Sequence, residues 1–196
     1  MADLEAERAA LRQRQGGGAR YDAPGAPAER LAWARLGTAY FSRKLNELDD
    51  AALDAPVCVP GWSRRHLVAH VGYQARGLSL LLEALRTGTE AEPVDHAARI
   101  SHGATLPPRA LRALFRHSAV HLDVEWRDLG SAAWAARMRG PGGRDMTVGE
   151  TPLIRARLVW FGAIAMGNGG RLRDVPEGLR EALGVGEDVA VEDLVI

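Results

Sequence analysis

Apolar residues recur every three or four positions along most of the chain, which is the spacing of a helix with one buried face. Four long stretches follow this pattern, from about 28 to 48, 64 to 86, 108 to 129 and 153 to 166. Ser63 before the second stretch and Gly88 after it are typical of the two ends of a helix. The pattern predicts an all-α fold, a four-helix bundle whose sites are built from side chains on facing helices.

The remaining segments predict less regular structure. Residues 3–14 have the pattern of a short polar helix, and the glycine and proline residues that follow make a linker, so residues 1–27 are expected to be a peripheral extension. The bundle is expected over 28–184, including a short last helix over 176–183, and the tail over 185–196, irregular or strand-like from 187. Residues 130–149 are rich in turns, and 132–139 fit either one turn of helix or a short strand.

Composition removes several classes of function. The 196 residues hold 25 basic and 25 acidic side chains, so the net charge is zero, which argues against a general nucleic-acid binder or a polybasic membrane-surface protein. The single cysteine, Cys58, excludes an intrachain disulfide, and we expect it to be a small buried apolar residue. The charged N-terminus lacks the apolar core of a signal peptide, and no apolar run reaches membrane-spanning length. A cytoplasmic protein is therefore expected.

The choice of basic residues adds a hint about the source. Lys44 is the one lysine among the 25 basic residues, and the other basic residues are arginines. With abundant alanine and glycine, this bias suggests a high-GC bacterial coding sequence.

One segment at the start of the second predicted helix carries a family resemblance. Residues 60–71 read PGWSRRHLVAHV, which resembles the PGWT(x)GH(x)LAHL signature of the mycothiol-dependent maleylpyruvate isomerase family, within the DinB-like superfamily. Further matches at 96–99, in the third helix, at 132–134 and over 153–176 extend the resemblance across residues 28–184. It implies a DinB-like four-helix bundle. It also implies a divalent metal, usually zinc, held by a histidine at the position of His70 and an E-x3-H pair on the fourth helix.

The fourth helix departs from this family pattern at the ligand positions. Aligned without a gap, the family glutamate falls on Leu158, the histidine on Gly162 and an aspartate on Ala165. Leucine and glycine cannot coordinate a metal, so of the three ligands only His70 remains. We therefore predict a degenerate metal site and no bound cofactor. The family's larger members, by resemblance, carry a separate C-terminal domain, and only about 20 residues follow Pro176 here.

A relocated metal site is the alternative. His117 and His121 form an H-x3-H pair on the third helix, and Glu125 follows one turn later. At 100° per residue, His117 faces solvent, His121 lies at the border of the apolar stripe, and Glu125 lies near its buried edge. The alternative site uses His70, His121 and Glu125, and zinc or mycothiol would then be the cofactor.

The pocket left by the lost metal defines the other candidate residues. His70 lies at the border of the apolar stripe and Gln74 near its centre, and both are predicted catalytic residues, with His70 as an acid, base or hydrogen-bond donor. Among the arginines that suit a carboxylate, Arg99, Arg155 and Arg157, the last is preferred because it aligns with a family arginine. Trp62, Leu158 and Gly162 are the other predicted substrate-binding residues. The competing interpretation makes His70 a core-edge histidine and Leu158 part of a refilled core.

Three functions remain open from the sequence. The first is a metal-independent isomerase, cyclase or related tailoring enzyme acting on a small acidic molecule. The second is a mycothiol- and metal-dependent isomerase or thiol transferase with relocated ligands. The third is a non-catalytic descendant that binds a small molecule or a protein. A small-molecule substrate is the expected partner, with neither nucleic acid nor membrane, and a homodimer through bundle faces stays open.

Overall fold

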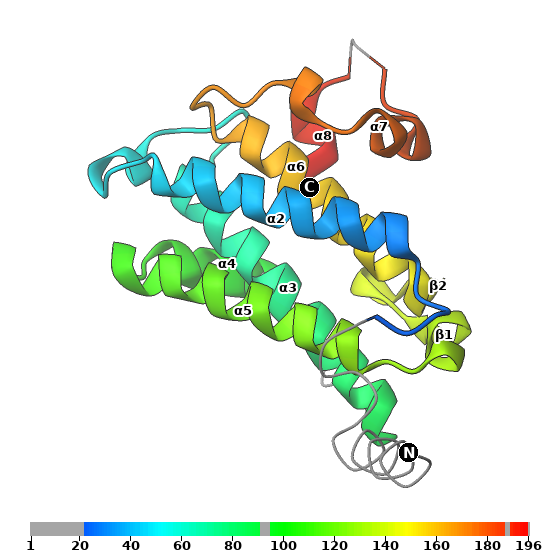
Figure 1. The fold of residues 1–196 in the computed structure, drawn as a ribbon. Coiled ribbons are helices and arrows are strands. Elements are labelled where there is room, and N and C mark those ends of the chain that lie inside the picture. Colours follow the sequence, from blue (N-terminus) through cyan, green and yellow to red (C-terminus); the bar gives the residue numbers. More distant parts are fainter. Residues whose placement is uncertain (1–21, 91–94, 187–188, 196) are drawn as a thin grey trace, which may run out of the picture.

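The computed structural model describes residues 22–90, 95–186 and 189–195, so the helix expected over 3–14 and the glycines at 16–18 lie outside the described residues. The helices and strands follow the chain as shown in Figure 1. The α-helices are α2 (Ala28–Asn46), α3 (Arg64–Thr87), α4 (His96–Ala104), α5 (Pro108–Asp128), α6 (Thr151–Ala165), α7 (Glu177–Leu183) and α8 (Val191–Val195). The two short strands are β1 (Arg137–Arg139) and β2 (Asp145–Thr147), and 3-10 turns cover Ala51–Asp54, Ser131–Ala135, Pro141–Gly143, Val148–Glu150 and Leu172–Asp174.

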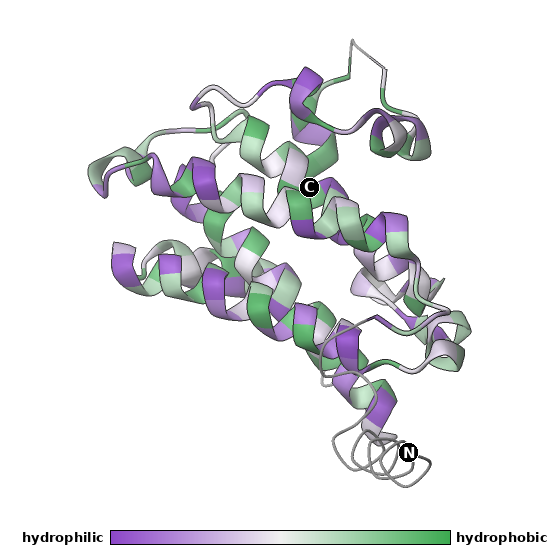
Figure 2. Ribbon diagram, viewed as in Figure 1, coloured by the Kyte–Doolittle hydropathy of each residue, from purple (hydrophilic) through white to green (hydrophobic). Residues whose placement is uncertain are grey.

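The four long helices form the predicted bundle from two closely packed pairs, α2 with α6 and α3 with α5. Their apolar residues gather on the sides that face one another, and polar residues cover the outside (Figure 2). Gly37 allows α2 to approach α6 closely, because a Cβ there would lie 2.6 Å from the ring of Trp160. The same indole donates a hydrogen bond from Nε1 to the Trp33 carbonyl, at 2.9 Å, which fixes the pair.

Helix α3 begins and ends at the residues that the sequence predicts. The main-chain N–H of Ser63 donates to His66 Nδ1 at 3.2 Å, so His66 completes the cap of the first turn. Gly88 ends the helix in the left-handed conformation, with φ of 71°. Because both ends are fixed, the position of His70 on the helix surface is fixed as well.

Several expectations for the connections need correction. Residues 131–139 combine both predicted alternatives, because a 3-10 turn precedes strand β1, which pairs antiparallel with β2. Helix α4 was not predicted as an element, since its nine residues are too few for a clear periodic pattern. The end of the tail is helical at α8, so the strand-like prediction is wrong there. Cys58 is exposed, which contradicts the expectation of burial, since its neighbour Val59 takes the buried place instead.

Helix α8 packs against α6, as Figure 1 shows near the C-terminal end. Val195 is 2% exposed and joins the main apolar core. Within the described part of the chain, no helix is both long enough and apolar enough to cross a membrane.

Candidate functional site

His70 lies on α3 among aromatic rings and the end of the tail. Its ring meets the ring of Trp62 edge-on, with the centroids 5.4 Å apart. Its Nδ1 lies 2.9 Å from Nε2 of His96, the first residue of α4. Its Nε2 lies 2.9 Å from the main-chain carbonyl oxygen of Val195. Four separate segments of the chain therefore meet at this imidazole.

These partners determine where the ring protons are. Burial, followed by the charges of His96 and Arg155, lowers the pKa of His70 to about 4, so the ring is neutral near pH 7. A carbonyl oxygen only accepts hydrogen bonds, so Nε2 of His70 must carry the proton and donate to Val195. Nδ1 then accepts from the Nε2–H of His96. The neutral His70 is thus set as a donor at Nε2.

The Val195 carbonyl predicts a defined tautomer for His70. In the wild type, ¹⁵N-resolved NMR at pH 7 should show the Nε2–H form of His70 alone. In His96→Leu, the bond at Nδ1 is lost but the Val195 carbonyl still accepts from Nε2, so the Nε2–H form should persist. A mixture of both neutral tautomers in the variant would show that His96, and not Val195, sets the tautomer.

The lowered pKa of His70 also predicts a pH dependence of stability. The unfolded histidine has its ordinary pKa of 6.5, so between pH 6.5 and 4 the unfolded chain binds a proton that the folded chain does not. The contribution is therefore complete above pH 6.5 and is lost as the pH falls toward 4, by up to ~3 kcal/mol. Urea unfolding at pH 7 and 4.5 should show a smaller loss for His70→Gln, whose amide can still donate to Val195. Equal losses in both proteins would contradict the prediction.

Gln74, one turn after His70, contacts a buried arginine. Arg155 on α6 is 1% exposed, and its Nη1 donates to the Val71 carbonyl at 2.7 Å and to Gln74 Oε1 at 3.1 Å. The amide of Gln74 donates to the Ile154 carbonyl at 3.3 Å. Nη2 of Arg155 has no hydrogen-bond partner among the described residues. Burial lowers the pKa of Arg155 to about 9, so the guanidinium is still charged at pH 7.

The sequence favours Arg157 over Arg155 as a carboxylate-binding residue, and the structure gives the two arginines different surroundings. Arg157 donates from Nε to the Leu194 carbonyl at 3.0 Å and from Nη2 to the Asp193 carbonyl at 2.7 Å. It therefore holds the end of α8. The signal for Arg155 was its place three residues before Leu158, on the face of α6 that enters the core.

The two ligand positions of the fourth helix lie in the core. Leu158 is 4% exposed and belongs to the main apolar cluster. At Gly162, a Cβ would lie 3.3 Å from Phe41 and 3.5 Å from Val71. Both ring nitrogens of His70 already have partners. The residues at the three positions therefore do not fit a metal in the arrangement that the resemblance implies.

A different set of ligand-type side chains meets between α3 and α5. Nε2 of His121 lies 3.4 Å from Oε1 of Glu125, and Glu83 brings a carboxylate so that the three groups lie within 4.8 Å of one another. Arg86 forms an ion pair with the buried Glu125, with its Nε 3.4 Å from the other carboxylate oxygen, Oε2. The structure thus joins His121 and Glu125 as the alternative site required, with Glu83 in place of His70, and leaves His117 exposed.

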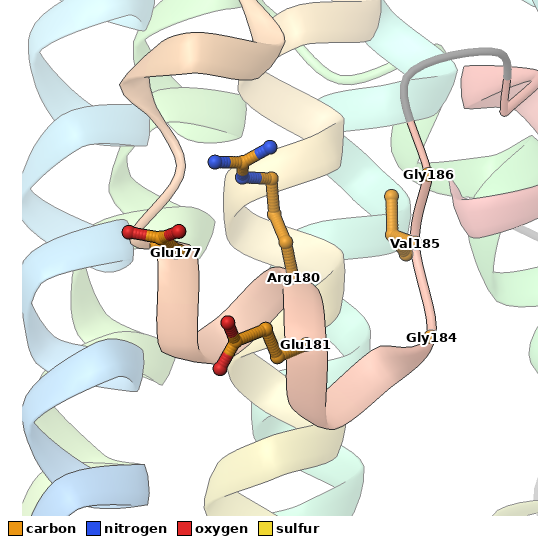
Figure 3. Close-up of a pocket in the computed structure, with 6 residues that line it drawn as sticks. All are labelled: Glu177, Arg180, Glu181, Gly184, Val185 and Gly186. Carbon is orange, nitrogen blue, oxygen red and sulfur yellow. The ribbon is translucent and has the colours of Figure 1, made fainter.

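Two hollows on the surface of the described residues lie away from His70. One, of about 310 Å³, is lined by Glu177, Arg180, Glu181 and residues 184–186, and the α7 side chains project from a single short helix there (Figure 3). Another lies between the ends of α3 and α5, at Leu85, Arg86, Ala133, Ala136 and residues 128–130. Neither is lined by a residue of the predicted pocket.

Comparisons with known proteins identify the same family as the motif does. The family model described as the mycothiol maleylpyruvate isomerase N-terminal domain matches residues 34–160. The crystal structure of the mycothiol-dependent maleylpyruvate isomerase is 36% identical, with a TM-score of 0.75, over 82% of this chain and 73% of that one. A histidine-to-alanine mutant of that isomerase is 35% identical, with a TM-score of 0.74 and the same coverage. No curated protein matches the chain.

Proposed function

Because the chain belongs to the mycothiol maleylpyruvate isomerase family, we propose that it is an isomerase-like enzyme that acts on a small acidic molecule without a bound metal. The absence of ligand side chains at Leu158 and Gly162 supports a mechanism without the family metal. A cytoplasmic enzyme with a small-molecule substrate fits this proposal.

The observation that carries the proposal is the buried guanidinium of Arg155. It is a positive charge without a carboxylate partner among the described residues, close enough to His70 to lower the pKa of that histidine. A buried charge without a counter-charge is costly, and a ligand carboxylate would offset that cost. The unpaired charge of Arg155 therefore favours an acidic substrate over a neutral one.

The proposed roles follow from the hydrogen bonds of the pocket. His70 would donate from Nε2–H to a substrate oxygen and stabilise negative charge that develops on it, with His96 holding the ring. Gln74 would position Arg155, while Arg157 and Trp62 would contact the substrate. Leu158 and Gly162 would form the apolar packing behind the substrate. Acid/base help and positioning of this kind do not require a metal.

The experiment is an NMR assay of maleylpyruvate conversion by chelator-treated protein. The assay is run with and without mycothiol and with and without added zinc. Conversion that persists after chelation supports the proposal. Conversion that depends on added zinc contradicts it, and binding of maleylpyruvate without conversion favours a non-catalytic ligand-binding protein.

The alternative is a mycothiol- and metal-dependent isomerase or thiol transferase with relocated ligands. The group of His121, Glu125 and Glu83 supports it, because a histidine and two carboxylates are ligands that zinc accepts. Zinc-dependent conversion that His121→Ala abolishes and His70→Ala leaves intact would distinguish this alternative from the metal-independent enzyme.

A further inference from the structure

The main-chain carbonyls at the end of α8 accept hydrogen bonds from the donors of the His70 site. The Val195 carbonyl accepts from His70, and the carbonyls of Leu194 and Asp193 accept from Arg157. The last carbonyls of a helix have no partner within the helix, so they are free to accept bonds from elsewhere. Three consecutive residues of one segment are thus bound by two side chains that the proposed function assigns to the substrate.

Helix α8 keeps its conformation only while it is docked on the bundle. It has only five residues, and a helix so short does not form by itself in water. Val195 is buried, Val191 and Leu194 are partly buried against the core, and Asp193 is exposed. Three apolar side chains therefore hold α8 in place, and a ligand oxygen can replace each of its carbonyl acceptors.

We propose that α8 is a built-in cover of the His70 site, which closes the site by offering carbonyl oxygens to the donors that would bind a ligand. When α8 leaves, His70 Nε2–H becomes accessible, and Arg157 loses its bonds to the carbonyls of Asp193 and Leu194. A substrate must therefore compete with the chain's own C-terminal segment, and the cover regulates the site. This inference rests on the proposed function for the role of the site, but not for the movement of α8.

The test measures access to His70 in the full-length protein, with no need for turnover. Diethyl pyrocarbonate modifies neutral imidazole nitrogens, and mass spectrometry gives the rate for each histidine at pH 7. In Val195→Glu, a carboxylate replaces the buried side chain and should expel α8. We expect His70 to be modified at least about tenfold faster than in the wild type.

Two controls and a second readout distinguish the movement of α8 from general loosening of the protein. Asp193→Ala changes an exposed side chain of the same helix and keeps its carbonyl, so the rate at His70 should stay at the wild-type value. The rate at the exposed His117 should be equal in all variants. Cys58 gives a second readout, because burial and then the charge of Glu192 on α8 raise the pKa of its thiol. Release of α8 should therefore speed the reaction of Cys58 with Ellman's reagent.

Each outcome decides between a removable cover and an integral part of the core. An unchanged rate at His70 in a folded Val195→Glu protein overturns the proposal. If Val195→Glu does not fold, Leu194→Asp repeats the test, and failure of both variants to fold also overturns it, since a cover must leave the bundle intact when it moves. Faster modification without any conversion of substrate leaves the cover standing and refutes the enzyme. Conversion through His70 with an unchanged modification rate refutes only the cover.

Discussion

Replacing Gly162 by histidine, the residue that the family resemblance places there, should destabilise the bundle by about 3 kcal/mol or more. A Cβ at this position already lies 3.3 Å from Phe41 and 3.5 Å from Val71, and it also meets Leu67 at 3.6 Å. The imidazole must displace these core side chains, and its two nitrogens would be buried without a metal or a hydrogen-bond partner. Urea unfolding at pH 7 gives the free energy of unfolding.

Gly77→His is the matched control for Gly162→His. Gly77 lies in helix α3, and a Cβ there meets nothing within 4 Å. The same substitution should therefore be neutral or stabilising by a few tenths of a kcal/mol, because histidine has the better helix propensity. If Gly162→His proves as stable as Gly77→His, the space behind His70 accepts a ligand side chain and the metal site is not lost by packing.

The second large effect is expected at His70. His70→Ala should lower the rate of maleylpyruvate conversion by about 10²–10⁴-fold, since it removes the donor at Nε2. The free energy of unfolding should change by only about 1 kcal/mol, because the side chain is at the edge of the core. His117→Ala, at an exposed position of α5, should change neither quantity.

The comparison of rate and stability separates the two interpretations of His70. A large loss of stability with conversion intact would make it a structural histidine. A loss of conversion with stability intact makes it part of the site. The NMR assay and urea unfolding give the two numbers on the same preparation.

The long helices were predictable because each combines a periodic apolar stripe with local end signals. Ser63 and Gly88 at the ends of α3 act within a few residues of the chain, so the sequence contains the whole signal. The bounds of α2, α5 and α6 differ from the predicted ones by one or two residues. By contrast, α8 forms only because its apolar side meets α6, and no local pattern encodes that contact.

The candidate site was predictable only in part for the same reason. The motif identified His70, and the helical wheel placed it next to Gln74. The partners that define its chemistry, His96 and Val195, lie 26 and 125 residues away in the sequence. Arg155 is buried by long-range packing, and its place three residues before Leu158 is the local signal that separates it from Arg157. Tertiary contacts, and not local pattern, decide the protonation and access of this site.

We propose that His70 does not hold a metal, and the zinc content of the purified protein decides this. The protein is purified without chelators, equilibrated with zinc, dialysed and analysed by inductively coupled plasma mass spectrometry, in parallel with His70→Ala and His121→Ala. We expect that His70→Ala does not change the zinc content. If the group of Glu83, His121 and Glu125 is also empty, the content is well below about 0.2 zinc per chain. One zinc per chain that His70→Ala abolishes would instead show that His70 is a metal ligand.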